Sequence, residues 1–220
     1  MKRQRKTRLN TGRANVVGIA ETPAALGLAA DLPPGTLDAI ELRLDAFDSA
    51  PAADGLRLPL IATARSPKEG GKNNLTAGER ASRYLALLDH AAAIDVELAS
   101  RGEMKSVLAA ARAAGCKIIL SVHDFKGTPS GLRTLQRKAA AAGADIFKIA
   151  VTPRTAGEFA ALLALLDDPP LPTSVMGMGR LGKASRIAAM ACGSVLNYGW
   201  LERPNVAGQW SAAELRAFAP

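Results

Sequence analysis

The sequence predicts a single-domain (β/α)8 barrel of the α/β class. Eight short apolar runs recur at fairly even spacing along the 220 residues, and 48% of the residues are apolar, which is enough for a substantial core. Alanine- and leucine-rich stretches with helical spacing separate most of these runs. Strand–helix alternation repeated eight times is typical of this barrel. A doubly wound open sheet is the alternative, but no glycine-rich nucleotide turn follows the first run.

The expected elements follow one another in order. Helical spacing is clearest in residues 77–93, 103–115 and 155–168. Thr76 with Glu79 predicts a capping box at a helix start. Gly115 and Gly143 follow helical stretches and predict helix stops. The expected strands cover residues 15–20, 39–45, 60–65, 93–99, 117–123, 145–151, 172–178 and 194–199.

The positive charge is concentrated at the N-terminus. The chain carries a net charge of +8, and residues 1–13 hold six of its 28 basic side chains and none of its 20 acidic ones. We therefore expect residues 1–14 to form a basic, disordered tail and residues 15–220 to form the (β/α)8 barrel domain. Such a tail could also touch RNA or an anionic surface, but the chain lacks an aromatic-rich platform for bases.

Composition also limits location and metal chemistry. No apolar run approaches the length of a membrane span, and no apolar segment of a leader follows the basic N-terminus, so a cytoplasmic protein without a membrane partner is expected. Cys116 and Cys192 lie in apolar segments and are expected to be buried thiols, not a disulfide framework. With two histidines and two cysteines, an ordinary zinc site is not expected.

Two neighbouring runs each carry one reactive side chain. Alternation places Ile119, Ser121 and His123 on one strand face, and Lys148 shares a face with Ile146 on the next. The 25 residues between His123 and Lys148 suit one strand–helix–strand crossover, hence adjacent parallel strands. Burial disfavours the charged form of a lysine and frees an amine to attack a carbonyl, while a histidine can then move protons. A surface lysine and a structural histidine are the alternatives for each residue alone.

Further charged side chains alternate with apolar ones along the earlier runs. Because helices cover the outside of a barrel, these polar faces must point inward, late in each strand, where barrel enzymes place their sites. Buried charge at this density is costly unless it is paired. An antiparallel sheet with one wet face would give the same alternation. The charged residues concerned are Glu41, Arg43, Asp45, Arg65, Asp95 and Glu97.

Three loops complete the expected site. Glu69 lies beside two glycines after the third run, as an acidic residue of an active-site loop would. A plain surface turn could have the same sequence. Arg186 lies near the start of a helix after the seventh run, where free N–H groups also attract anions. The long Gly- and Pro-bearing segment 198–210 suits a lid over the barrel mouth.

The motifs ELRLD, ATARSPKEGG, DVEL, SVHDF, KIAV, MGRLGKASR and NYG…GQW, in this order, resemble the type I 3-dehydroquinate dehydratases of the shikimate pathway. The resemblance covers about residues 15–211. It implies a (β/α)8 barrel that converts 3-dehydroquinate to 3-dehydroshikimate and water without a metal or cofactor. It also implies a small-molecule substrate and no nucleic-acid partner, and we expect a homodimer.

The resemblance assigns roles to matching positions. It implies that Lys148 forms a Schiff base with the substrate ketone, that His123 is the general acid and base, and that Glu69 is an acidic residue near His123. Substrate-binding roles are implied for Glu41, Arg43, Arg65, Arg186, Asn205 and Gln209. Asn205 stands where the family lid commonly has serine, and no hairpin precedes the first strand to plug the barrel floor.

Two other functions share some of these features. A Schiff-base aldolase on the same barrel would use Lys148, but no clear phosphate-binding glycine loop follows the seventh strand. A nucleic-acid-binding protein would use the basic tail, but it would leave the inward-facing carboxylates without a purpose. A barrel with only a structural role is disfavoured because both chemical residues are present.

Overall fold

A computed structural model of the chain, which describes residues 7–51, 53 and 56–219, shows one sheet of eight parallel strands curled into a barrel. Neighbouring strands pair in the order β7-β6-β5-β4-β3-β2-β1-β8, and Val195 N donates to Thr173 O at 3.0 Å across the remaining seam. The (β/α)8 fold predicted from the sequence is thereby confirmed. The strands are β1 (Asn15–Ala20), β2 (Ala39–Arg43), β3 (Leu60–Thr63), β4 (Ala91–Glu97), β5 (Lys117–Asp124), β6 (Ile146–Val151), β7 (Thr173–Gly177) and β8 (Leu196–Trp200).

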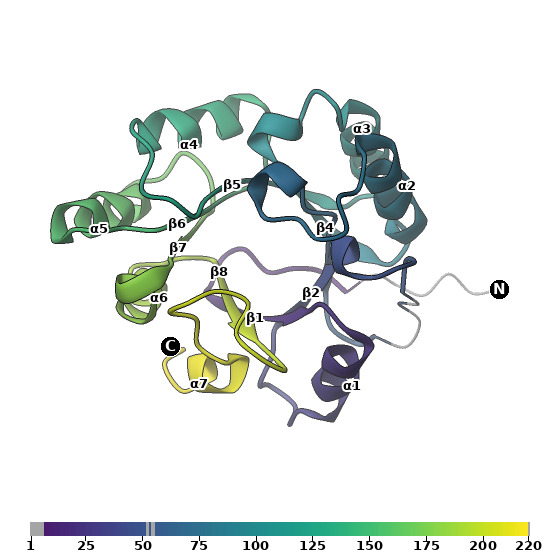
Figure 1. Cartoon of the computed structure of the whole chain (residues 1–220), viewed down its shortest axis with the longest axis horizontal. Coiled ribbons are helices and arrows are strands. Elements are labelled where there is room, and N and C mark those ends of the chain that lie inside the picture. Colours follow the sequence, from purple (N-terminus) through teal and green to yellow (C-terminus); the bar gives the residue numbers. More distant parts are fainter. Residues whose placement is uncertain (1–6, 52, 54–55, 220) are drawn as a thin grey trace.

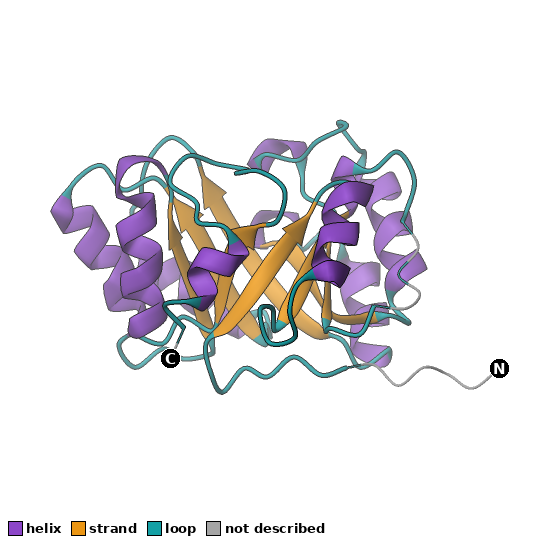
Figure 2. Cartoon of the chain, turned by 90° about the horizontal axis from the view of Figure 1, so that it is seen from below, coloured by secondary structure: helices purple, strands orange, loops and turns teal. Residues whose placement is uncertain are grey.

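Helices surround the strands, as Figures 1 and 2 show. The capping box predicted at Thr76 is confirmed, since its side chain and that of Glu79 each accept from the other's backbone N–H. Gly115 and Gly143 follow the helices that they were expected to stop, at φ of +74° and +77°. The α-helices are α1 (Pro23–Asp31), α2 (Ala77–Leu87), α3 (Lys105–Ala113), α4 (Leu132–Ala141), α5 (Ala156–Leu163), α6 (Gly182–Ala191) and α7 (Ala212–Arg216).

The buried apolar side chains form two layers, as strand alternation requires. One layer packs between the strands and the helices and includes Leu42, Ile94, Leu120 and Phe147. The other fills the barrel and includes Ile61, Ile119 and Ile146. Ile119 and Ile146 share β5 and β6 with Leu120 and Phe147 but lie on the opposite faces. The inner layer supports the polar side chains nearer the carboxyl ends of the strands.

Some boundaries differ from those expected. Residues 44–46 form a 3-10 helix, η1 (Leu44–Ala46), so Asp45 lies beyond the end of β2. Strand β4 begins at Ala91, within the stretch whose alanine-rich composition suggested helix. Alanine favours helix only weakly, and pairing of Ala91 with Leu60 of β3 decides the structure here.

The described part of the N-terminal segment passes beneath the barrel (Figure 2). Leu9 is 4% exposed and belongs to the inner apolar layer, together with Val17 and Ile146. The side chain of Asn15 donates to Asn10 O at 2.6 Å and holds this segment to β1. Residues 1–6 of the expected disordered tail lie outside the described residues.

The structure also bears on the predicted burial of the two cysteines and on the search for a membrane-spanning helix. Cys116 is buried, but Cys192 is exposed, so its predicted burial is wrong. Cys192 follows the last residue of α6, where the apolar pattern of the helix no longer dictates burial. Among the described helices, none is both long and apolar enough to cross a lipid bilayer.

Candidate active site

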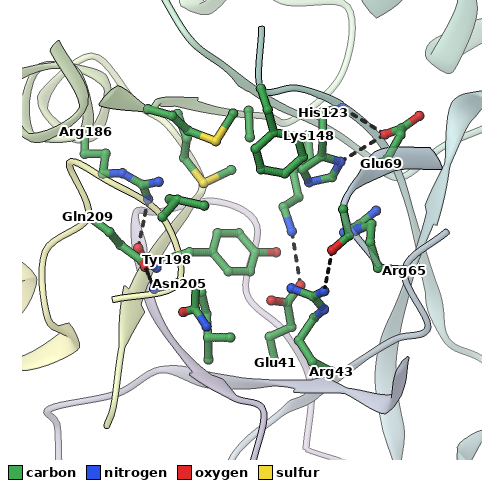
Figure 3. Close-up of a pocket in the computed structure, with 17 residues that line it drawn as sticks. Glu41, Arg43, Arg65, Glu69, His123, Lys148, Arg186, Tyr198, Asn205 and Gln209 are labelled. Carbon is green, nitrogen blue, oxygen red and sulfur yellow. Dashed lines mark hydrogen bonds and ion pairs between the residues drawn. The ribbon is translucent and has the colours of Figure 1, made fainter. Parts of the chain in front are cut away.

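The nine side chains expected to form the site line one pocket at the carboxyl ends of the strands (Figure 3). They come from β2, β5, β6 and α6, from the segment after β3, and from the loop after β8. The shared pocket follows from the barrel, because the carboxyl ends of all its strands meet at one mouth. The nine are Glu41, Arg43, Arg65, Glu69, His123, Lys148, Arg186, Asn205 and Gln209.

Lys148 is the buried amine of the pocket. Its residue is 4% exposed, and Nζ lies 2.7 Å from Asp95 Oδ2 and 3.1 Å from Glu41 Oε1. The same nitrogen lies 3.9 Å from the centroid of the Tyr198 ring, within the range of a cation–π contact. Against the penalty of burial, the charges of Arg65 and Lys148 hold the pKa of Asp95 well below its usual range. The lysine therefore faces an ionised carboxylate.

His123 lies on the strand next to Lys148, as the sequence predicted. Strands β5 and β6 pair in parallel, with Ser121 opposite Lys148 and His123 one side-chain step further along the same face. Burial, with the positive charges of Arg65 and Lys148, lowers the pKa of His123 well below its ordinary value. The imidazole is therefore neutral near pH 7, the form in which one ring nitrogen carries a free lone pair.

Glu69 is the carboxylate that contacts His123. Its Oε2 lies 3.1 Å from His123 Nδ1 and accepts the backbone N–H of His123 at 2.9 Å. Burial raises the pKa of Glu69 to about 7. The 3-10 helix η2 (Pro67–Glu69) presents this side chain, and a Cβ at Gly71 would lie 2.2 Å from Arg65 O, so only glycine lets the loop fold back this tightly.

The two acids of β4, Asp95 and Glu97, bind arginines. Arg65 donates to Asp95 Oδ2 and to Glu97 Oε1, each at 3.0 Å, and to Ser121 Oγ at 2.8 Å. Glu97 also accepts from Arg80 of α2, whose side chain reaches through the barrel wall. These buried charges are paired and hydrogen-bonded, which is the condition for tolerating them.

Glu41 and Arg43 leave β2 next to this network. Glu41 accepts from Thr63 Oγ1 at 3.0 Å in addition to Lys148. Arg43 makes a two-pronged contact with Asp45, through Nε at 3.0 Å and Nη2 at 2.9 Å. Such bidentate pairing fixes the plane of the guanidinium.

Arg186 lies on the opposite side of the pocket, beneath the loop that follows β8. It is 4% exposed, its Nη1 donates to Tyr198 O at 2.9 Å, and burial lowers its pKa to about 10. The loop is docked on the segment after β7, because Gly179 N donates to Ala207 O at 2.9 Å. Within the loop, Asn205 N donates to Gln209 Oε1 at 2.8 Å.

Sequence reasoning missed several residues that shape the pocket. Met176, Met178, Phe125 and Tyr198 line it without having been singled out. Arg80 was also missed, although there was a signal: it precedes Tyr84 by four positions and therefore shares its buried helix face.

The fold and the site together are those of a barrel enzyme, a lyase acting beside a carbonyl group. Residues 17–219 match the profile of the type I 3-dehydroquinase family, which is more than half of the chain. The chain belongs to that family. The family and the enzyme class predicted from the sequence are thereby confirmed.

The chain is also similar to individual 3-dehydroquinate dehydratases from several organisms. A 3-dehydroquinate dehydratase of Methanothrix thermoacetophila is 36% identical over 185 residues, covering 81% of this chain and 79% of its own. One from Salmonella paratyphi B is 32% identical over 201 residues, covering 81% and 80%. The crystal structure of a type I 3-dehydroquinate dehydratase from Clostridium difficile, with covalently modified comenic acid, aligns with a TM-score of 0.82 at 25% identity, covering 98% and 96%.

Proposed function

We propose that this chain converts 3-dehydroquinate to 3-dehydroshikimate and water through a Schiff base on Lys148. The single observation that carries the proposal is the pairing of a buried amine with a neutral imidazole on adjoining strands, across a pocket from Arg186. Of the nine expected site residues, Lys148 alone carries an amine. Membership of the type I 3-dehydroquinase family supports the substrate and the reaction.

The first step is loss of a proton from Lys148. Attack on a ketone needs the lone pair of a neutral amine, and Lys148 Nζ lies within ion-pair distance of Asp95 and Glu41. Neutral His123 takes that proton, and the amine then adds to the C3 ketone to give a carbinolamine. The imidazolium returns the proton to the carbinolamine hydroxyl, which leaves as water. The product is an iminium whose positive charge replaces that of the ammonium beside Asp95.

The iminium then permits the dehydration. It withdraws electrons from C2, so His123 can remove a proton there and leave an enamine. The electrons of the enamine expel the C1 hydroxyl, which His123 protonates as it departs. Water hydrolyses the remaining iminium and releases 3-dehydroshikimate and the free lysine. The ionised form of Glu69 supports both roles, because it accepts from Nδ1 and leaves Nε2 to exchange protons.

The remaining site residues hold the substrate. Arg186 is suited to the carboxylate because its planar fork matches two oxygens, and Gln209 and Asn205 close over it from the loop. Glu41 and Arg43 face the ring hydroxyls. The terminal nitrogens of Arg65 are held by Asp95, Glu97 and Ser121, so its part is to supply a fixed positive charge at the substrate's edge.

Incubation with 3-dehydroquinate tests the reaction directly. The proposed dehydration creates a conjugated enone, so ultraviolet absorbance must rise as substrate disappears. The aldolase alternative would release carbon–carbon cleavage products, which mass spectrometry distinguishes. No appearance of the enone at high enzyme concentration would contradict the proposal.

Three further expectations belong to the same proposal. We propose that residues 15–220 form the catalytic domain, that the chain acts as a homodimer, and that it works in the cytoplasm. Light scattering on the purified protein tests the assembly, and cell fractionation tests the location. A monomeric mass over the working concentration range would contradict the dimer.

A further inference from the structure

Tyr198 joins the two sides of the pocket. It lies on β8 and is 2% exposed, with its ring against Lys148 Nζ. Its backbone oxygen accepts from Arg186 Nη1 at 2.9 Å. Tyr198 therefore contacts both Lys148 and Arg186, the residue proposed to bind the substrate carboxylate. Its side chain takes no part in the proton transfers proposed for Lys148 and His123.

The hydroxyl of Tyr198 has no hydrogen-bond partner among the described residues, although it is buried. The other tyrosine of the chain behaves as a buried tyrosine normally does, since Tyr84 donates to the backbone oxygen of Asp95. Burying a hydroxyl without a partner costs free energy, so an unsatisfied hydroxyl on a pocket wall indicates a ligand group. Arg186 Nε and Asn205 Oδ1 are also unpartnered within the described protein, and both residues line the same pocket.

The direction of the hydroxyl indicates where on the substrate that group lies. In Figure 3 it points away from Arg186, toward Lys148 and Glu41. Glu41 lies 3.1 Å from Lys148 Nζ, so it is next to the atom that bonds to the substrate's carbonyl carbon. A polar group between Glu41 and Tyr198 is therefore carried by a ring carbon adjacent to that carbonyl.

The chemistry of the two side chains defines the group. Ionised Glu41 only accepts hydrogen bonds. Burial, with the charges of Glu41 and Asp95, raises the pKa of Tyr198 well above its ordinary value, so the phenol stays protonated and can donate. An alcohol on the substrate ring meets both requirements, because its hydroxyl can donate to Glu41 and accept from Tyr198.

We propose that the Tyr198 hydroxyl donates a hydrogen bond to the C4 hydroxyl of 3-dehydroquinate, the alcohol on the carbon adjacent to the ketone, while Glu41 accepts the proton of that alcohol. This rests on the proposed function, because Lys148 must bond to C3. Tyr198 thereby makes the site selective for a ketone with a neighbouring hydroxyl. A site built to bind a hydroxyl rejects an analogue that lacks it, because its own buried polar groups are left unpaired.

The test crosses two enzymes with two substrates. Tyr198→Phe removes the hydroxyl and keeps the ring against Lys148 and the backbone oxygen for Arg186. We expect it to lower kcat/KM for 3-dehydroquinate by about twofold to tenfold, the range for one hydrogen bond. For 4-deoxy-3-dehydroquinate, which lacks the alcohol, kcat/KM of the variant should equal or exceed that of the unmodified enzyme.

Tyr84→Phe is the matched control, since it removes the only other tyrosine hydroxyl from outside the pocket. It should lower thermal stability and leave the ratio of kcat/KM between the two substrates unchanged. An equal loss on both substrates in Tyr198→Phe would overturn the assignment to C4, as would no loss on either. Failure of the unmodified enzyme to dehydrate 3-dehydroquinate would instead contradict the proposed function itself.

Discussion

Lys148 Nζ lies 2.7 Å from Asp95 Oδ2 at the centre of the barrel, so the candidate nucleophile is held in an ion pair. The sequence indicated that burial alone would free the amine of its proton. In the structure, the amine also lies within ion-pair distance of two carboxylates, those of Asp95 and Glu41. The same carboxylates would stabilise the iminium, which carries its charge on the same nitrogen. We propose that His123, the imidazole on the adjoining strand, is the base that takes the proton of this amine.

His123→Ala should separate imine formation from proton transfer. The amine of Lys148 remains and can lose its proton to water instead, so the iminium still forms, although more slowly, and removal of the C2 proton slows as well. Loss of a general base typically costs about 10² to 10⁴ in rate. Steady-state enone formation should fall by that amount, while borohydride still attaches a substrate-derived mass to the protein. A variant that dehydrates at the normal rate would show that another group moves the protons.

Glu69 should set the pH dependence near neutrality. Its pKa of about 7 means that the carboxylate ionises as pH rises through that value. Ionised Glu69 accepts from His123 Nδ1, so kcat/KM should increase from pH 6 to pH 8 with an apparent pKa near 7. The pKa of His123 is itself lowered, so its own titration belongs to a more acidic range.

Glu69→Gln tests that assignment, because an amide does not titrate. The variant should lose the rise near pH 7 and keep a lower, flat profile across this range. Its stability gives a second check: the folded protein holds the Glu69 proton to higher pH than the unfolded chain, so ionisation costs stability as pH rises. Between pH 5 and 8 the melting temperature of the unmodified protein should therefore fall relative to that of Glu69→Gln. A shared profile in both proteins would assign the titration elsewhere.

Arg186→Lys should not be a conservative change. Lysine offers a point charge where arginine offers a planar fork for two oxygens. A hydrogen bond to a charged group contributes about 1.5 to 3 kcal/mol, so KM for 3-dehydroquinate should rise at least about tenfold. Arg180→Lys is the control, because Arg180 precedes α6 and is not among the residues that line the pocket. An unchanged KM in Arg186→Lys would mean that the carboxylate is bound elsewhere.

Leu9 should stabilise the barrel from below. It is buried in the inner apolar layer, and truncating a buried leucine to alanine costs about 2 kcal/mol or more. For a domain of this size, Leu9→Ala should lower the melting temperature by about 4 to 8 °C. Leu28→Ala removes a side chain that is 44% exposed, so it should change little. Equal melting temperatures for both variants would show that Leu9 contributes nothing to the floor.

Strand periodicity predicted the fold and most of the site, because successive side chains of a barrel strand point alternately into the barrel and toward the helices. Once helices cover the outside, Glu41, Asp95, His123 and Lys148 must point inward, and the structure places them there. The contact of Glu69 with His123 follows from a loop that folds back through Gly71, and no spacing rule encodes that path. The role of Arg80 could not be predicted either. The pattern of α2 shows that Arg80 lies on a buried face, but it does not show that the side chain binds Glu97 of β4.

The burial of Leu9 also escaped the sequence. Six basic residues dominate the first thirteen and suggest a solvated tail, whereas Leu9 among them is buried and packs with the inner apolar layer. In the sequence, Tyr198 is one residue of the motif NYG…GQW, and nothing there distinguishes it from its neighbours. Its significance rests on a hydroxyl without a partner, which is a property of three-dimensional packing and cannot be read from the order of residues.

The most direct test of the account is to trap the substrate on the enzyme. Borohydride added during turnover of 3-dehydroquinate reduces an iminium to a stable secondary amine, and peptide mass spectrometry locates it. The account predicts one substrate-derived mass on Lys148, and neither labelling nor turnover in Lys148→Ala. A label on another residue, or normal dehydration by Lys148→Ala, would contradict it.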